Sequence, residues 1–128
     1  MIKATVPLAI CVMTLLFYHG ADAQQPGQVI HLAKLQIDPG QLESYKAALK
    51  EEIETSVRTE PGVLKLDAVA EKNNPASITI LEVYADTNAY KSHLQSPHFK
   101  KYKLATKDMV KSLELIEATP VVLTTKGK

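Results

Sequence analysis

Apolar residues recur at every second position in four parts of the chain, and this period is typical of β-strands. The four segments are Val29–Ile37, Val63–Glu71, Ser77–Tyr84 and Ser112–Val122. The third segment is the richest in residues that favour strands. In the first segment the alternation places His31 on the same face as the apolar residues that follow it. The chain is therefore expected to form a sheet of four strands.

Between these strands the apolar residues recur three and four positions apart, which indicates helices. The first helix follows the turn Asp38-Pro39-Gly40, and Glu60-Pro61-Gly62 ends it because a residue before proline avoids the helical conformation. Its apolar stripe is expected to consist of Leu42, Tyr45, Leu49, Ile53 and Val57. A second helix begins after the possible caps Asp86-Thr87-Asn88. Ser96-Pro97 restarts it, since serine caps and proline suits the first helical position.

The resulting order is strand, helix, strand, strand, helix pair, strand. This order predicts an α+β fold of the ferredoxin-like type, with one antiparallel sheet and helices on one face. Such a sheet should be apolar on one face only. The third strand is apolar on both, through Ile78 and Ile80 on one side and Leu81 and Val83 on the other. We therefore expect a homodimer in which two sheets pack against each other.

Residues 1–23 have the features of a signal peptide. Lys3 gives a positive start, Val6–Tyr18 forms a short apolar run, and Ala21-Asp22-Ala23 is a cleavage site of the A-x-A type. The run is too short to span a membrane. The sequence thus predicts cleavage after Ala23 and a periplasmic or secreted protein with no membrane attachment. We expect a polar leader over 24–28, one domain over 29–122 and a flexible tail over 123–128.

Composition excludes several classes of function. The chain has 15 basic and 14 acidic side chains, a net charge of +1, so no general positive field attracts nucleic acid. The lysines between Lys100 and Lys111 are interpreted as the solvated face of a helix. The single cysteine, Cys11, lies in the predicted signal peptide, so the domain has no disulfide or thiolate chemistry. The histidine spacing does not indicate a metal site, and we expect no cofactor.

The segment Tyr84–Tyr102, YADTNAYKSHLQSPHFKKY, concentrates aromatic and histidine residues. Tyr90 and His93 are three residues apart and share a helical face, so both can reach one cavity. Two other interpretations remain open for His93 and His98. His93 could interact with the free carbonyl groups at the end of its helix. His98 is expected to form a local hydrogen bond that fixes the helix break.

This segment resembles the antibiotic biosynthesis monooxygenase family of dimeric α/β-barrel proteins. The resemblance rests chiefly on LEVYADTNAYKSHLQSPHFKKY (Leu81–Tyr102) and on the turns Asp38-Pro39-Gly40 and Glu60-Pro61-Gly62. It extends over about Val29–Val122. The family includes cofactor-free quinol and anthrone monooxygenases, haem-degrading enzymes, an isomerase and proteins without assigned activity, so membership alone does not define an activity.

The resemblance implies roles for individual residues. Tyr84 lies where the monooxygenases often place a tryptophan against the substrate, Tyr90 where a pocket tyrosine occurs, and His93 and His98 on recurrent histidines. The absence of tryptophan departs from the pattern associated with polyketide substrates. Haem-degrading relatives need an asparagine on the first strand and a tryptophan on the third, and the chain has neither, so haem degradation is not expected.

The expected activity is cofactor-free oxygenation of a small quinol or related electron-rich aromatic by O₂. Histidine suits the role of base because it titrates near neutral pH. We expect His93 to act as base and Tyr90 as an orienting hydrogen-bond donor. The expected substrate contacts are His31, Tyr84, His98, Phe99 and Tyr102. Glu82 is a further candidate if it is buried, and pairing with a lysine in the dimer is its alternative. The alternative function is a non-catalytic or detoxifying binding module for small aromatic compounds.

Overall fold

The computed structural model describes residues 27–127 of the 128-residue chain. Its strands are β1 (Val29–Ile37), β2 (Val63–Glu71), β3 (Asn74–Tyr84) and β4 (Val110–Ala118). Its α-helices are α1 (Leu42–Thr59), α2 (Thr87–Gln95) and α3 (Pro97–Thr106), and a 3-10 turn, η1 (Pro39–Gln41), precedes α1. The expected order of elements and the ferredoxin-like α+β fold are confirmed. The predicted signal peptide lies outside the described residues.

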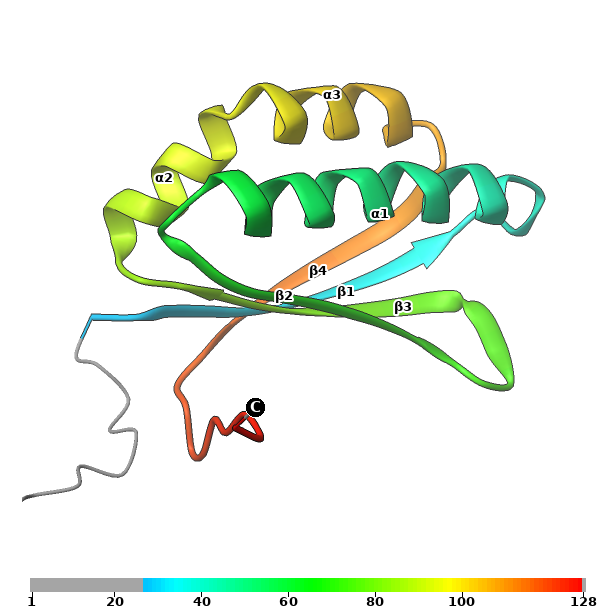
Figure 1. Cartoon of the computed structure of the whole chain (residues 1–128). Coiled ribbons are helices and arrows are strands. Elements are labelled where there is room, and N and C mark those ends of the chain that lie inside the picture. Colours follow the sequence, from blue (N-terminus) through cyan, green and yellow to red (C-terminus); the bar gives the residue numbers. More distant parts are fainter. Residues whose placement is uncertain (1–26, 128) are drawn as a thin grey trace, which may run out of the picture.

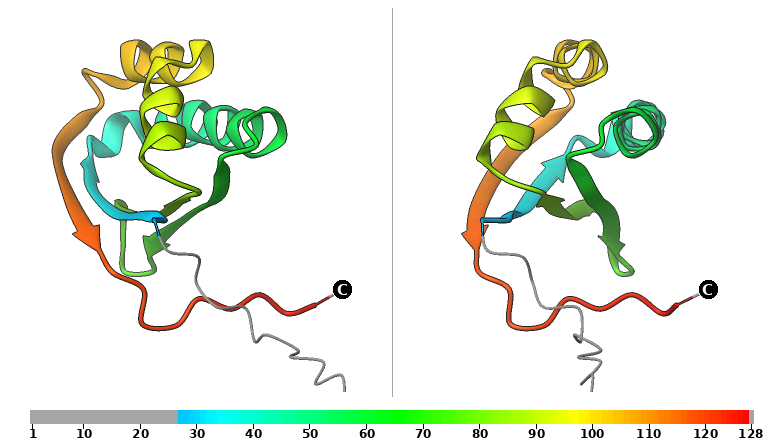
Figure 2. Two further views of the ribbon diagram at one scale, coloured as in Figure 1. Left: turned by 90° about the vertical axis from the view of Figure 1, so that its left-hand side faces the viewer. Right: turned by 60° about the vertical axis from the view of Figure 1, so that its left-hand side comes forward.

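The strands form one antiparallel sheet in the order β2-β3-β1-β4. All three helices lie on one face of this sheet (Figure 1). Viewed from the end, α1 and the α2–α3 pair stand apart above the curved sheet (Figure 2). The β1–β3 register pairs His31 with Glu82, so their side chains project from neighbouring strands toward the helices.

The main core joins the helix-facing side of β1 and β3 to α1 and α3. Its buried members are Ala33, Leu35, Ile37, Tyr45, Leu49, Ile78, Ile80 and Tyr102. The predicted stripe of α1 is wrong at one end, because Val57 is 50% exposed. The buried stripe instead continues from Leu49 through Glu52 and Ser56. Two polar side chains of α1 therefore face the interior.

The predicted helix boundaries at the aromatic segment are confirmed. Asp86 Oδ1 accepts a hydrogen bond from the Ala89 amide at 2.7 Å and caps α2. Ser96 Oγ accepts one from the Phe99 amide at 3.3 Å and caps α3, with Pro97 at the first helical position. The end of α1 is also as predicted, with Glu60 as the residue that follows its last turn.

Gly62 allows β2 to start close against α2. A side-chain carbon at Gly62 would overlap the side chain of Ala89. The Gly62 carbonyl accepts a hydrogen bond from the Ala85 amide at 2.8 Å, which ties the two turns together. Glycine at this position thus places Glu60, two residues earlier, beside the helix that carries His93.

Two predicted strand boundaries are wrong. β4 spans Val110–Ala118 and not Ser112–Val122. It ends there because Ala118 pairs with Ile30, one residue from the start of β1, and Pro120 has no amide hydrogen to continue the ladder. β3 begins at Asn74 and not Ser77, because Asn74 pairs with Glu71 and closes a tight hairpin.

The face of the sheet opposite the helices is partly apolar, as the sequence suggested. Leu32 pairs with Leu81 and Ile30 with Val83, so these four side chains form adjacent rows. Val83 is buried and Leu81 is half-buried. None of the helices in residues 27–127 combines the length and apolar character needed to cross a lipid bilayer.

Candidate active site

A cavity of about 600 Å³ lies between the helices and the sheet, a volume suited to a small ligand. Five of the residues predicted from the sequence line it: Tyr84, Tyr90, His93, Phe99 and Tyr102. His31 and His98 are not among the lining residues. His31 lies behind the ring of Tyr90, with 4.7 Å between the ring centroids. The substrate contacts of His31 and His98 stay predictions.

Aromatic rings form a continuous wall along the cavity. Tyr84 packs against Tyr90 with ring centroids 5.1 Å apart, and against His93 at 5.4 Å. His93 in turn contacts the ring of Phe99 at 4.9 Å. Such flat apolar faces favour an aromatic ligand. His93 is the only histidine in this wall among the described residues.

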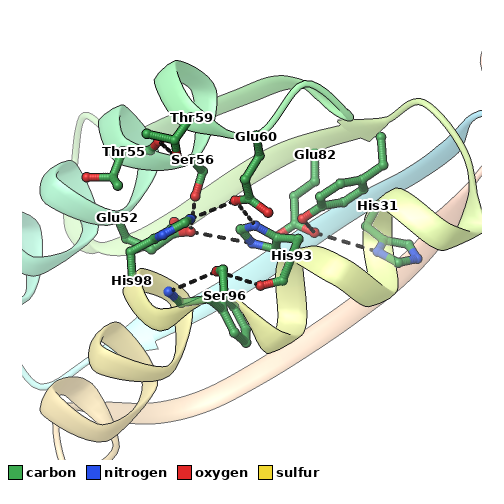
Figure 3. A network of polar contacts seen from close by, with 12 residues as sticks. His31, Glu52, Thr55, Ser56, Thr59, Glu60, Glu82, His93, Ser96 and His98 are labelled. Carbon is green, nitrogen blue, oxygen red and sulfur yellow. Dashed lines mark hydrogen bonds and ion pairs between the residues drawn. The ribbon is translucent and has the colours of Figure 1, made fainter.

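His93 lies in the last turn of α2 and is held by two carboxylates (Figure 3). Its Nδ1 is 2.9 Å from Glu60 Oε2, and its Nε2 is 3.4 Å from Glu52 Oε1. The free carbonyl of His93 accepts a hydrogen bond from Ser96 Oγ at 2.7 Å and one from the Ser96 amide at 3.0 Å. Serine thus satisfies the helix end, and the imidazole does not take that role.

Glu60 also binds the second histidine of the segment. Its Oε2 lies 2.7 Å from His98 Nε2, across 38 residues of sequence. The predicted local hydrogen bond of His98 is therefore wrong, and Ser96 alone fixes the helix break. Burial would raise the pKa of Glu60, but the hydrogen bonds from His93 and His98 outweigh it and lower the pKa below its usual value. Glu60 is thus an anion that accepts from both rings.

Glu52 is the second carboxylate beside His93, and it lines the cavity. It is buried on α1 and accepts a hydrogen bond from Ser56 Oγ at 2.7 Å. Burial raises the pKa of Glu52, and the contacts with Ser56 and His93 only partly offset this. The two carboxylates beside His93 therefore differ, because the pKa of Glu60 is lowered and that of Glu52 is raised.

A second histidine–glutamate pair lies on the sheet, on the other side of Tyr84. Glu82 Oε2 accepts a hydrogen bond from the Tyr84 hydroxyl at 3.2 Å, and burial raises the pKa of Glu82. His31 Nδ1 is 3.6 Å from the same oxygen, beyond hydrogen-bond reach, and is buried without another partner. Glu82 thus faces a tyrosine and a histidine and pairs with no lysine in residues 27–127, while its pairing with a lysine in the dimer stays a prediction.

The innermost contact of the wall is a pair of tyrosines. The hydroxyl groups of Tyr45 and Tyr102 lie 2.6 Å apart in the core. Burial raises the pKa of both, so both remain neutral. This pair joins α1 to α3, and Tyr102 lines the cavity.

The histidine cluster also has the composition of a metal site. Glu52, His93 and His98 offer ligand atoms that all lie within 4.8 Å of one another. Sequence spacing did not indicate this group, because its three members come from three different helices, α1, α2 and α3. The same side chains form a chain of contacts from Glu52 through His93 and Glu60 to His98, in which Glu60 already engages one nitrogen of each ring. The hydrogen bonds to Glu60 therefore account for the positions of both imidazole rings.

Sequence reasoning missed Glu52 and Glu60 as members of the site. Glu52 was detectable, since it follows Leu49 by three positions and precedes Ser56 by four, on the buried stripe of α1. A carboxylate at such a position indicates a functional role or a buried partner. Glu60 was recognised only as part of the turn that ends α1. No local signal connects it to His93, 33 residues later.

Comparison with known proteins places the chain in a family. The sequence profile of the family named antibiotic biosynthesis monooxygenase matches residues 28–104. A comparison with curated protein sequences gives no match. The match covers β1 to α3, and hence every residue of the histidine cluster.

Solved structures agree with this placement. A candidate antibiotic biosynthesis monooxygenase from Bacteroides thetaiotaomicron is 59% identical over 80% of this chain and 97% of that protein, with a TM-score of 0.76. A candidate monooxygenase from Lactobacillus acidophilus is 34% identical over 71% of this chain, with a TM-score of 0.69; the match covers 43% of that longer protein. A protein of Nitrosomonas europaea, 17% identical with a TM-score of 0.69, shares the fold. The chain belongs to the antibiotic biosynthesis monooxygenase family.

Proposed function

We propose that this protein is a cofactor-independent monooxygenase that oxidises a small quinol or a related electron-rich aromatic with O₂. The observation that carries the proposal is the position of His93. It lies in the wall of an aromatic-lined cavity, and its Nδ1 is hydrogen-bonded to Glu60. Both the cavity and the family support chemistry on a small molecule.

The hydrogen bond to Glu60 defines which nitrogen of His93 acts as base. An ionised carboxylate can only accept, so Nδ1 must donate its hydrogen. In the neutral ring the lone pair is then on Nε2, the nitrogen that faces Glu52. An orienting carboxylate of this kind holds a catalytic imidazole in the productive tautomer. His93 Nε2 is accordingly the atom that removes a proton from the substrate.

The reaction needs no redox group on the protein. Removal of a phenolic or activated C–H proton gives an anion that transfers one electron to O₂, and the resulting radical and superoxide combine to form a C–O bond. The peroxide takes the proton from His93, its O–O bond breaks, and water leaves as the same carbon loses its remaining proton. One oxygen atom is retained as a carbonyl. Burial raises the pKa of Glu52, and its Oε1 lies 3.4 Å from His93 Nε2, so it is placed to exchange a proton with that nitrogen. Tyr90, in the same wall, orients the substrate oxygen.

Oxygen uptake with a panel of quinols and anthrones tests the proposal. The expected result is consumption of O₂ above the rate of autoxidation, with the oxidised product containing one atom from ¹⁸O₂. Heat-denatured protein provides the background rate. Binding of these compounds without accelerated oxygen uptake would instead establish the alternative, a binding module of the same fold.

We also propose that two copies pack through the sheet faces that carry no helices. The support is the row of apolar side chains formed by Leu32, Leu81 and their neighbours on that face, together with Val69, which is 66% exposed. A second copy of the same surface covers these side chains most simply.

Replacing Leu81 with lysine should disrupt this dimer, because the charge would be buried without a partner. Sedimentation at micromolar concentration should give a dimer for the wild type and a monomer or aggregate for Leu81→Lys. Leu104→Lys is the matched control, since Leu104 is 72% exposed on α3, away from the sheet. A wild-type monomer at these concentrations would refute the proposal.

A further inference from the structure

The cavity has a positively charged side that plays no part in the chemistry described above. Lys103 and Lys107 are four residues apart near the end of α3, so they share a face of that helix. Lys111 follows at the start of β4. All three line the cavity and are exposed. They belong to the run of lysines between Lys100 and Lys111, which is interpreted from the sequence as the solvated face of a helix.

These lysines carry no ion pair within the described residues. Lys46, Lys65 and Lys101 each have a carboxylate within 4.0 Å, whereas Lys103, Lys107 and Lys111 have none in residues 27–127. Asp108 is next to this region in the chain, and Asp38 is next to it in space, where the charge of Lys111 contributes to lowering the pKa of Asp38; neither carboxylate lines the cavity. Asp38 uses its carboxylate to bind the Gly40 amide and the Gln41 side chain. The positive charge at this side is therefore not neutralised by a lining carboxylate.

The carboxylates of the cavity lie toward its other end. Glu52 and Glu82 line the wall that also contains His93 and Tyr84. α2, which carries His93, and the junction of α3 with β4, which carries the lysines, are at opposite ends of the helical layer (Figure 1). The cavity thus has an acidic, histidine-bearing end and a basic end.

Apolar surface connects the basic end to the aromatic wall. Leu113 and Leu115 lie on the helix-facing side of β4, opposite Leu35 and Ala33, yet they remain 47% and 46% exposed. Both line the cavity. An apolar ring that rests on these leucines would place a substituent beside the lysines.

We infer that the substrate is a small aromatic acid, in which a carboxylate or similar anionic group binds Lys103, Lys107 and Lys111 while the hydroxylated ring lies beside His93. The inference rests on the proposed function, because it names the substrate class of the same cavity. Lysines attract the anionic group at one end, and the wall that contains Glu52 and Glu82 at the other end offers it no lysine. The two effects together give the ring a single orientation, with its oxygen atoms toward His93.

Binding of 2,5-dihydroxybenzoate and its neutral analogue 2,5-dihydroxybenzamide, measured by calorimetry without O₂, tests the inference. Both are quinols of similar shape, and only the first is an anion. Wild type should bind the benzoate about tenfold more tightly, a difference within the range of a few charge pairs near a surface. The preference should decrease as salt is added, since screening weakens exposed charges.

The triple variant Lys103→Gln, Lys107→Gln, Lys111→Gln should bind the two compounds equally, with an unchanged melting temperature. Lys100→Gln is the matched control, because Lys100 lies on the same helix but does not line the cavity; it should keep the preference. Equal binding by wild type, a preference that survives the triple variant, or no binding of either compound would overturn the inference. A lysine-dependent preference without any oxygen uptake would leave the inference intact and refute the monooxygenase proposal.

Discussion

Two histidine–glutamate pairs lie on either side of Tyr84. Both histidines are buried, but they differ in their hydrogen bonds and in whether they line the cavity. His93 is 3% exposed and His31 is 4% exposed, so burial does not distinguish them. His93 donates to an ionised glutamate at 2.9 Å and lines the cavity. His31 is 3.6 Å from Glu82, has no hydrogen bond at Nδ1, and lies behind Tyr90.

The comparison shows what makes a buried histidine a usable base. A base needs a partner that defines its tautomer and a path to the substrate. Glu60 provides the first for His93, and the cavity provides the second. His31 has neither, even though the alternation of β1 directs it toward the helices as the sequence predicted. Its ring makes edge contacts with the rings of Tyr84 and Tyr90.

Removing His93 should have the largest effect. His93→Ala should lower the rate of oxygen uptake by about a hundredfold to ten-thousandfold, the usual loss for a general base. His31→Gln, the matched control from the second pair, should change the rate by less than about threefold, because the side chain does not reach the cavity. Steady-state oxygen consumption on the two variants measures both effects. An equal loss in both would remove the distinction between the pairs.

Weakening the anchor of His93 should have the next largest effect. Glu60→Gln keeps the size of the side chain, but the amide can donate a hydrogen bond to Nδ1. In a fraction of the molecules His93 would then have its proton on Nε2, which is the unproductive tautomer. The loss of an orienting carboxylate reaches about ten-thousandfold in a well-studied hydrolytic triad, and at least about tenfold is expected here. The change should fall on kcat with KM nearly unchanged, since Glu60 does not line the cavity. A purely structural role for Glu60 would instead lower the melting temperature and leave kcat per folded molecule intact.

The smallest effects are expected in the free energy of unfolding. The pKa shifts of Glu60 and Glu52 should make opposite contributions to it. The pKa of Glu60 is lowered in the folded protein, so its contribution is present above its ordinary value of 4.5 and is lost as the pH falls through the lowered value. Burial raises the pKa of Glu52. Its contribution is therefore present at low pH and is lost as the pH rises through the raised value.

Glu60→Gln should accordingly lower the free energy of unfolding at pH 7 by about 1 kcal/mol, and by less near pH 4. Glu52→Gln should be neutral or stabilising by about 1 kcal/mol at pH 7, because a neutral amide avoids the cost of burying a charge. Urea denaturation of both variants at the two pH values gives these differences. The same sign for both variants at pH 7 would contradict the opposite directions of the two pKa shifts.

Much of the fold was predictable because it rests on local signals. The periods of apolar residues gave the order of elements, and caps such as Asp86 and Ser96 gave the helix starts. The strand boundaries were predicted wrongly where the extent of pairing with a neighbouring strand sets the end of a strand. β4 stops at Ala118 because β1 offers no further partner, and β3 starts at Asn74 because Glu71 pairs with it. The sequence of one strand does not indicate where its partner strands begin and end.

The site was predictable only in part, for a related reason. The aromatic wall and His93 come from one continuous segment whose helical spacing places them together. Glu60, in contrast, reaches His93 and His98 over 33 and 38 residues of sequence. The prediction for His98 failed on this contact, since a local hydrogen bond was the simpler expectation next to a helix break. Glu52 was overlooked because its carboxylate interrupts an apolar stripe.

The most direct test of the account is the protonation of the His93 ring, measured by the ¹⁵N chemical shifts of ¹⁵N-histidine-labelled protein at a pH where the ring is neutral. His93→Gln assigns the signal. The account predicts a proton on Nδ1 and a free Nε2, with loss of this single tautomer in Glu60→Gln. A proton on Nε2 in the wild type would contradict the central claim, because the nitrogen assigned as the base would then have no lone pair with which to accept a proton.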